Sequence, residues 1–275
     1  MISFSEVFRW TITLGGKQNF LSAPWVTALL DRTPESKRRA RILWLLSLGP
    51  HYFHLRDAPE YAGMSEAEYR EAFFETGRQS RKKIYDEIFA DMELGKVVMD
   101  YGCGMGLFAR VLAQNVDKVY GADISKGAIA GAKILNPADN LEYVIADAEG
   151  LKAVPDAGVD TMISLNMVHH LAVNVYDHVL GNMARKLKPG GRLILHIQCT
   201  DPGWRTEEEW LADTSLRGRL KYRFGIHCFS LPEERHTEMV AKHGFKDISI
   251  KPVSSFTDHY FDDIGNQHIL IATKT

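Results

Sequence analysis

Short apolar runs that alternate with amphipathic segments constrain this chain more than any other feature of its sequence. Buried-strand patterns occupy residues 97–101, 119–122, 141–145, 159–165 and 192–197, and helical patterns occupy residues 108–114, 126–135 and 175–187. A further helix is expected at 231–243, with last strands at 247–251 and 268–273. Such alternation is typical of a parallel sheet with helices on both faces. We therefore predict an α/β fold, a doubly wound and mostly parallel seven-stranded sheet of Rossmann-like type.

The chain changes character near residue 95. Helical patterns precede that point, at 34–47, 65–74 and 78–92, and Ser65 and Glu68 have the spacing of a capping box. We expect residues 1–94 to form an N-terminal helical cap that helps to bind substrate, and residues 95–275 to form the main domain. The aromatic-rich stretch 199–230 is too long for an ordinary connection, and it is expected to be an insertion that covers a site.

The composition is that of an ordinary soluble protein, with 45% hydrophobic and 25% charged residues among 275. A formal net charge of -2 argues against a broad nucleic-acid-binding surface, so a nucleic-acid partner is unlikely. The three cysteines lack C-x-x-C spacing and are expected to be reduced thiols of a cytoplasmic protein. No apolar run is long enough to span a bilayer, and residues 1–16 have no clean signal-peptide core. We expect a cytoplasmic protein without a membrane partner.

A glycine-rich turn at residues 102–106 follows the first predicted strand and precedes a helix. Ligands of open α/β sheets collect at the carboxyl ends of the strands, and glycines there let the backbone approach a ligand closely. The dinucleotide-binding spacing G-x-G-x-x-G would need glycine at Leu107, so that match fails. The observed spacing is G-x-G-x-G after Asp100. An acid at this position suits a cationic amino group and repels a pyrophosphate.

Acidic residues also follow the next two predicted strands. Asp123 ends the second strand, where a carboxylate is able to accept hydrogen bonds from both ribose hydroxyls. Asp147 ends the third strand and is a candidate acceptor for an adenine amino group. We expect these two carboxylates and that of Asp100 to meet in one site.

Together these segments resemble the class I S-adenosylmethionine-dependent methyltransferase superfamily, most closely its small-molecule branch. The resemblance covers roughly residues 95–198 and rests on the segments 100–106, 147–148, 166–170 and 187–193, together with Asp123. It implies S-adenosyl-L-methionine as the cofactor. The candidate cofactor-binding residues are Asp100, Gly102, Gly104, Gly106, Asp123, Ile124, Asp147, Ala148 and Asn166.

Methyl transfer to a neutral hydroxyl requires removal of its proton, which favours a nearby base. His170 and His169 follow the fourth predicted strand, and His196 ends the fifth. We expect one of these histidines to act as the base or to orient the acceptor. The alternative is that the pair only packs at a helix start. His170, His196, Asp201 and His227 are residue types that bind metals, but no spacing among them is diagnostic and no metal is predicted.

The leading hypothesis is a methyltransferase acting on a small molecule, preferably on a hydroxyl oxygen of a secondary metabolite, sugar or lipid-like intermediate. Three alternatives stay open: a cofactor-binding protein without transfer activity, an RNA-modifying N-methyltransferase and an NAD-dependent oxidoreductase. The Asn166–His169 segment lacks the Asp/Asn-Pro-Pro-Tyr/Phe motif of enzymes that methylate adenine or glutamine nitrogens. A homodimer is a possible assembly.

Overall fold

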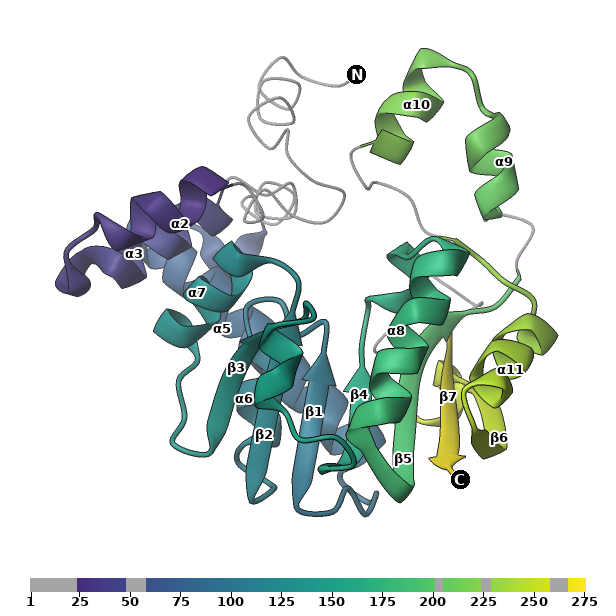
Figure 1. Ribbon diagram of the computed structural model, residues 1–275. Helices are drawn as coiled ribbons and strands as arrows, with labels where there is room; N and C mark the ends of the chain where they lie inside the picture. The colour runs from purple at the N-terminus through teal and green to yellow at the C-terminus, as the bar shows by residue number, and fades with distance from the viewer. Residues whose placement is uncertain (1–23, 48–57, 201–204, 224–228, 258–266) are drawn as a thin grey trace.

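The computed structural model describes residues 24–47, 58–200, 205–223, 229–257 and 267–275. Its strands form a seven-stranded sheet in the order β3-β2-β1-β4-β5-β7-β6 (Figure 1). Their bounds are β1 Val97–Tyr101, β2 Lys118–Asp123, β3 Leu141–Ile145, β4 Val159–Ser164, β5 Leu187–Gln198, β6 Phe245–Pro252 and β7 Gln267–Lys274. The helices are α2 Pro24–Asp31, α3 Glu35–Leu46, α5 Glu66–Ile84, α6 Leu107–Leu112, α7 Lys126–Leu135, α8 Val173–Lys186, α9 Glu207–Ala212, α10 Leu216–Arg223 and α11 Glu233–Lys242.

The sheet is parallel from β3 through β5 and ends in an antiparallel hairpin. β1 pairs in parallel with β2 and β4, and β4 pairs in parallel with β5. β7 runs antiparallel to both β5 and β6. The predicted mostly parallel, seven-stranded Rossmann-like sheet is therefore confirmed. The strand order reverses at β1, and the crevice at the carboxyl ends beside such a switch point is where ligands bind in open α/β sheets.

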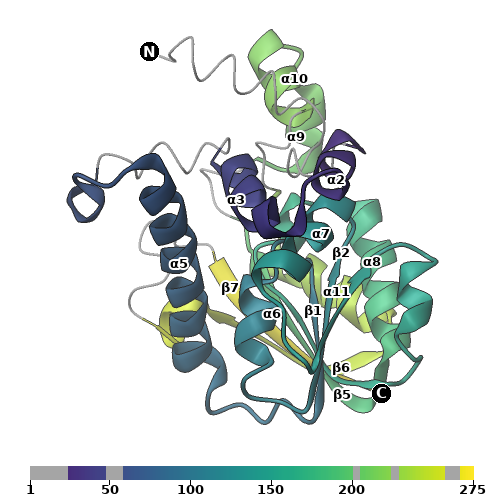
Figure 2. The same ribbon diagram turned by 90° about the vertical axis from the view of Figure 1, so that its left-hand side faces the viewer.

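Side chains of successive strand residues alternate between two hydrophobic layers. Met99 and Tyr101 of β1 face the layer that holds α8 and α11. Val98 faces the opposite layer, which α5 and α6 cover with Ile84 and Phe108 (Figure 2). This two-sided burial explains why the strands read as continuous apolar runs in the sequence. It also means that the side chains of adjacent residues at one strand tip point to opposite faces of the sheet.

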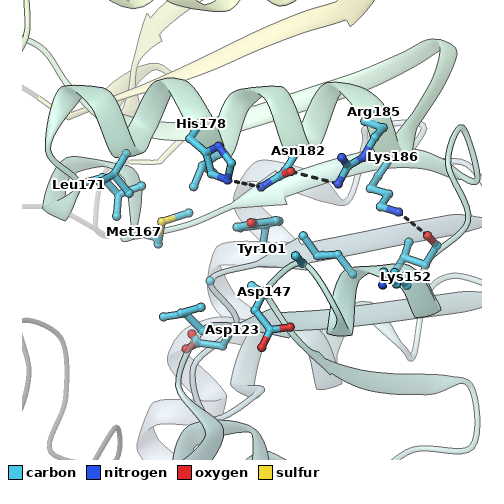
Figure 3. Close-up of a pocket in the computed structure, with 18 of the residues that line it drawn as sticks. Tyr101, Asp123, Asp147, Lys152, Met167, Leu171, His178, Asn182, Arg185 and Lys186 are labelled. Carbon is cyan, nitrogen blue, oxygen red and sulfur yellow. Dashed lines mark hydrogen bonds between the residues drawn. The ribbon is translucent and has the colours of Figure 1, made fainter.

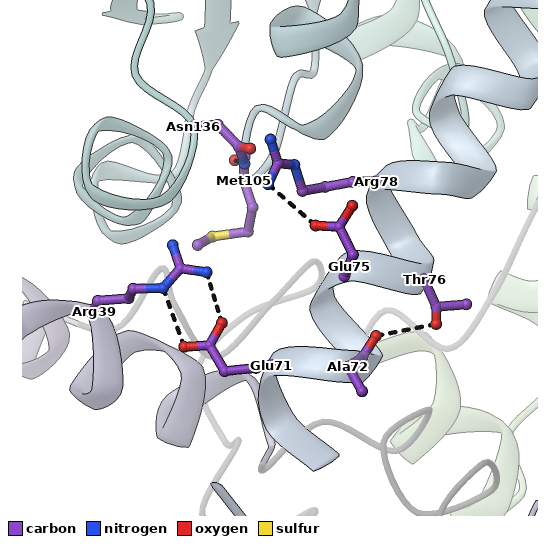
Figure 4. Close-up of polar contacts among 8 residues, drawn as sticks. All are labelled: Arg39, Glu71, Ala72, Glu75, Thr76, Arg78, Met105 and Asn136. Atoms are coloured by element: carbon purple, nitrogen blue, oxygen red, sulfur yellow. Dashed lines mark hydrogen bonds and ion pairs between the residues drawn. The ribbon is translucent and has the colours of Figure 1, made fainter. Parts of the chain in front are cut away.

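The described part of the predicted cap region is helical. Its helices α2 and α3 pack against α7, where a Cβ atom on Gly131 would lie 3.0 Å from Ile42. Arg39 of α3 also donates to Glu71 of α5, with Nη2 2.6 Å and Nε 3.1 Å from the carboxylate oxygens (Figure 4). These contacts attach the cap helices to the main sheet layer. The division of the chain at residue 94 stays a prediction.

The structure corrects the expected boundary between two helices of the cap. The patterns at 65–74 and 78–92 form one continuous helix, α5, which ends in a π-helical turn at Tyr85–Phe89. Gly77 lies inside this helix, where a Cβ atom would sit 3.4 Å from Leu107 of α6, so glycine here permits close packing and does not end the helix. The expected capping box is present at the helix start: Glu68 N–H donates to Ser65 Oγ, and Ser65 N–H donates to Glu68.

A second difference concerns β5, which begins at Leu187, five residues before the expected start. Leu187 pairs with Val159 and Arg192 pairs with Thr161, so the residues between them form a bulge with Gly190 at φ +76°. Glycine is suited to such a bulge because it adopts positive φ without steric cost. The described part of the 199–230 stretch carries α9 and α10, which lie beyond the carboxyl ends of the strands in Figure 1. In the described ranges, no helix combines the length and apolarity needed to cross a bilayer.

Candidate functional site

The glycine-rich turn joins β1 to α6, and all three of its glycines have positive φ. A Cβ atom on Gly106 would lie 2.1 Å from Tyr143 Oη, and one on Gly102 would lie 2.6 Å from Met167 Cγ. Gly104 has φ +52° and nothing within 4 Å of its Cβ position. Packing therefore requires glycine at the first and third positions, whereas the middle glycine leaves its backbone open to close approach by a ligand.

Asn136, the first residue after α7, donates a hydrogen bond to the glycine-rich turn. Its Nδ2 donates to the carbonyl oxygen of Met105 at 2.7 Å, which attaches the turn to the carboxyl end of α7 (Figure 4). The Met105 side chain meanwhile reaches Gly131 of α7, where a Cβ atom would lie 2.3 Å from its methyl carbon. The turn is thus fixed both to the sheet and to the helix that carries the cap.

Asp123 at the tip of β2 contacts the glycine turn directly. Its Oδ2 accepts from Gly104 N–H at 2.9 Å, and its Oδ1 accepts from Ser125 N–H at 2.8 Å. Burial raises the pKa of this carboxyl, while the two backbone hydrogen bonds lower it. A carboxylate has about four lone-pair positions. The two that remain are able to accept hydrogen bonds from a diol.

A groove of about 960 Å³ opens beside these strand tips (Figure 3). Five of the predicted cofactor residues line it, namely Gly102, Asp123, Ile124, Asp147 and Ala148. Asp147 Oδ1 accepts from Gly150 N–H at 2.7 Å, which starts a short 3-10 turn and leaves Oδ2 without a hydrogen bond from that turn. Ile124 is 55% exposed, which is unusual for a large aliphatic side chain next to a groove and suits contact with a flat apolar ligand surface.

The opposite wall of the groove comes from α8, which the sequence reasoning missed. Asn182 Nδ2 lies 3.3 Å from His178 Nε2, and Arg185 Nη2 donates to Asn182 Oδ1 at 3.1 Å (Figure 3). The buried Lys186 Nζ donates to Val154 O and to Asp156 at 2.7 and 2.6 Å, which anchors the loop across from the helix. The three- and four-residue spacing of Val175, His178, Asn182 and Lys186 is the signal that could have indicated a shared helix face.

Four other predicted cofactor residues do not line the groove: Asp100, Gly104, Gly106 and Asn166. Asp100 is the informative case, because strand alternation turns its side chain toward the α5 and α6 layer. It is fully buried, and its Oδ2 has no hydrogen-bond partner among the described residues. Burial raises its pKa to about 7; the positive charge of Arg81 lowers it and the charge of Asp123 raises it. The structure therefore brings two of the three expected carboxylates to one groove and places the third behind the turn.

The candidate catalytic histidines form a cluster near the tips of β4 and β5. The ring centroids of His169 and His170 lie 4.3 Å apart, and those of His169 and His196 lie 5.4 Å apart at 81°. Burial lowers the pKa of His196 to about 4 and lowers that of His169 well below its usual value, so both rings are neutral at pH 7. None of these histidines lines the groove.

A strained residue fixes the tautomer of one of these rings. Asn166 has φ +54°, uncommon for a residue with a side chain, and its backbone N–H donates to His196 Nδ1 at 3.2 Å. A backbone amide is only a donor, so Nδ1 is the accepting nitrogen and the neutral ring carries its proton on Nε2. With Nδ1 engaged in this way, His196 is a weaker candidate for the base than His169.

The described residues contain no group of three side chains suited to hold a metal ion. Asp201 and His227, two of the four residues of metal-binding type named from the sequence, lie outside the described residues. Cys103 and Cys199 are buried free thiols, and burial raises the pKa of both.

The strand order, the glycine turn and the acidic strand tips together define a class I, Rossmann-like methyltransferase fold. Residues 99–195 match the family model described as a methyltransferase domain. Residues 99–195 thus match a methyltransferase domain within a sheet of the class I fold, and S-adenosylmethionine is the cofactor of that class.

Comparison with individual proteins gives partial matches. The chain is 26% identical over 186 residues to a phosphoethanolamine N-methyltransferase of Triticum aestivum, covering 66% of this chain and 34% of that enzyme. It is 34% identical over 172 residues to an uncharacterized RNA methyltransferase of Halalkalibacterium halodurans, covering 53% of this chain and 38% of that protein. The chain therefore spans little more than a third of either relative. A structure of geranyl diphosphate methyltransferase matches with a TM-score of 0.51 at 16% identity, covering 78% of this chain and 92% of that one, and this likeness supports the fold alone.

Proposed function

We propose that this protein transfers a methyl group from S-adenosylmethionine to a small-molecule acceptor, preferably to a hydroxyl oxygen. The observation that carries the proposal is that Gly102, Asp123 and Asp147 line one groove at the carboxyl ends of three adjacent parallel strands. Hydrogen-bond acceptors that converge on one concave, largely apolar surface are the usual features of a small-molecule site.

The side chains present fit such a cofactor. Asp123 has lone pairs left for the ribose hydroxyls, and Asp147 is placed to accept a hydrogen bond from an adenine amino group. Ile124 offers an exposed apolar face to a purine. The carboxyl of Asp100, buried and lacking a hydrogen bond on Oδ2, fits a cationic amino group. We therefore retain Gly104, Gly106 and Asn166 as backbone contributors, Asp100 as a charged group behind the glycine turn, and the five residues that line the groove as direct contacts.

When bound, S-adenosylmethionine supplies a methyl group already activated by its positively charged sulfur. The protein then has to hold the acceptor in line, exclude water and receive a proton from it. His169 and His170 lie two and three residues beyond Met167, which itself lines the groove. The buried His169 ring, whose pKa burial lowers well below its usual value, is neutral and therefore in the correct protonation state to accept a proton at pH 7.

RNA methylation is the second candidate, and one relative carries that name. It requires a basic surface that contacts many phosphates. The chain has 33 basic and 35 acidic residues, which favours a small acceptor. A protein that binds the cofactor without transferring its methyl group is the remaining alternative. We further propose a cytoplasmic location, a cap region at 1–94 that contributes to the acceptor site, and no membrane partner.

Calorimetric titration with S-adenosylhomocysteine, and separately with NAD, tests the cofactor assignment. We expect binding of the first and none of the second. Incubation of the purified protein and S-adenosylmethionine with a metabolite extract, followed by mass spectrometry, tests transfer. A metabolite that gains one methyl group supports the proposal. Cofactor binding without any methylated product would identify a binding protein, and product only in an RNA fraction would favour the second candidate.

A further inference from the structure

Two glutamine side chains are buried side by side at the carboxyl ends of β5 and the start of β7. Gln198 and Gln267 pair directly across these antiparallel strands and are 2% and 5% exposed. Directly opposite residues in a sheet point to the same face. Within the described ranges, the Oε1 atoms of both side chains have no hydrogen-bond partner within 3.5 Å.

This amide pair continues the histidine cluster described above. His196 lies two residues before Gln198 in β5 and therefore on the same face, where burial lowers the pKa of the ring and a long hydrogen bond to the Gln267 side chain raises it by a smaller amount. The His169 ring stands edge-on to His196, and its buried Nδ1 also has no partner among the described residues. The positive charge of Arg81 in α5 acts on both His196 and Asp100. These groups form what we call the buried polar cluster: His169, His196, Gln198 and Gln267.

The rest of the same sheet face is apolar. Below the cluster, Ile194 and Ile271 pair across β5 and β7, and Ile269 pairs with His196. These isoleucines belong to the core layer that α5 and the π-helical turn after it cover with Ile84 and Ile88. A buried polar atom without a hydrogen bond destabilises a fold, and an apolar side chain of the same length would avoid that penalty. Several such atoms gathered at the ligand-binding edge of the sheet therefore indicate groups retained for contact with a ligand.

We propose that the buried polar cluster is the acceptor-binding site, and that it binds a head group with at least two polar hydrogens, as in an amino alcohol or a polyol. The inference rests on the proposed methyltransferase function. An amide carbonyl oxygen has two lone pairs that accept hydrogen bonds, so the Gln198 oxygen and the capacity that His196 leaves on the Gln267 oxygen select a ligand that donates. Neither a bare hydrocarbon nor a fully ionised phosphate satisfies them.

The location agrees with transfer from the neighbouring cofactor site. β5 is two strands from β1, about 10 Å at the usual strand spacing. The loop after β4 separates the two sites: Met167 lines the groove, and His169 belongs to the cluster. The acceptor head group would thus lie beside the neutral imidazole of His169, which is able to receive its proton.

Substitution of the glutamines by methionine tests this inference without knowledge of the acceptor, because methionine keeps the length and removes the polar atoms. We expect Gln198→Met and Gln267→Met each to raise the melting temperature of the full-length protein by a few degrees and to leave the affinity for S-adenosylhomocysteine within twofold. Gln114→Met, at an exposed position, is the neutral control. Asn140→Leu is the control for lost hydrogen bonds, since Asn140 Nδ2 donates to Ala113 O and Val116 O. It is expected to lower the melting temperature. A fall in the melting temperature of both methionine variants would show that the glutamines are structural and would overturn the proposal.

Transfer of tritium from labelled S-adenosylmethionine to a small-molecule extract provides the second readout. Charcoal first removes unreacted S-adenosylmethionine, which is itself a cation. Cation-exchange chromatography then retains amines and passes neutral polyols, so the labelled fraction distinguishes the two sources of the head group. We expect each methionine variant to lower labelling at least tenfold in the fraction that the wild type labels. Undiminished labelling would overturn the proposal. If the wild type labels neither fraction and does not bind S-adenosylhomocysteine, the proposed function fails, while the melting temperatures still decide whether the cluster is built for a ligand.

Discussion

Asp123 Oδ2 accepts a hydrogen bond from the backbone N–H of Gly104 at 2.9 Å. The tip of β2 therefore holds the turn that follows β1, and the ribose-binding candidate and the glycine turn form a single unit. Because the same carboxylate also accepts from Ser125, which caps the start of α7, a change at Asp123 is felt on two elements of the site.

We expect Asp123→Asn to weaken binding of S-adenosylhomocysteine by about 1–3 kcal/mol, since a partly buried charged acceptor is replaced by a neutral amide. Calorimetry measures the change. Asp139→Asn, at an exposed position, is the matched control and should bind as the wild type does. Equal affinities for the two variants would remove Asp123 from the site.

Alanine substitutions in the glycine turn test which glycine is needed for packing and which for close approach of the ligand. Gly106→Ala places a Cβ atom 2.1 Å from Tyr143 Oη and should lower the free energy of unfolding by more than about 2 kcal/mol. Gly104→Ala meets no neighbour, so it should cost only about 1 kcal/mol for its positive φ while impairing cofactor binding strongly. Urea unfolding and calorimetry measure the two effects. The same loss of stability in both variants would contradict this division of roles.

The raised pKa of Asp100 predicts that ligand binding releases a proton. Its pKa of about 7 in the folded protein lies above that of an unfolded aspartate, so the neutral carboxyl contributes stability that is lost as the pH rises from about 4 through 7. A cationic amino group bound nearby favours the carboxylate, so binding of S-adenosylhomocysteine at about pH 6 should release a proton. Calorimetry in buffers of different ionisation enthalpy counts released protons. Asp100→Asn should abolish the release, and a release that persists in this variant would assign it to another group.

The stability that the buried His236 ring contributes changes with pH in the direction opposite to that of Asp100. The pKa of His236 is lowered to about 4 by burial, and this ring lies 3.2 Å from the Gln198 carbonyl oxygen through Nε2. Because the folded pKa lies below the unfolded value of about 6.5, the stability from this neutral ring is present above pH 6.5 and is lost as the pH falls toward 4. His236→Gln should make the dependence of unfolding free energy on pH shallower by about one proton. Gln114→Met, at an exposed position without a titratable group, should leave the slope unchanged; an equal slope in both variants would refute the assignment.

Asn166 tests whether backbone conformation alone sets the contact with His196. Asn166→Ala should lower the unfolding free energy by about 1 kcal/mol, because alanine tolerates φ +54° poorly. Asn166→Gly should restore most of that loss, since the hydrogen bond comes from the backbone and survives in both variants. Thermal unfolding compares the two. Equal stability of the alanine and glycine variants would mean that the strain is not significant.

Much of the fold could be predicted because the apolar runs that form its strands and the helical patterns between them are local features of the sequence. Apolar runs of strand length gave β1 and β3 their correct ends, and α7 was also predicted with its observed bounds. Boundaries set by packing were wrong. Gly77 breaks helices on average but here lets α5 approach α6, and the bulge before Arg192 depends on pairing with β4, which no local pattern reveals.

The site could be predicted in part for the same reason. Asp123 ends β2 and Asp147 follows the end of β3 by two residues, so the parallel topology alone brings them to one edge. The direction of the Asp100 side chain depended on which layer each residue of β1 faces, and that is a tertiary property. The pairing of Gln198 with Gln267 joins residues far apart in the sequence through an antiparallel register, which no single segment encodes.

The position of β7 also affects how the molecule is made. This strand is the last of the seven in the sequence, yet it lies between β5 and β6 in the sheet. During synthesis β5 and β6 therefore leave the ribosome before β7, the strand that joins them. The backbone amides and carbonyls that β5 and β6 direct toward β7 have no hydrogen-bond partner in that strand until residues 267–274 emerge. Since Gln267 is the first residue of that strand, the nascent chain completes the proposed acceptor site in the same step that closes its sheet.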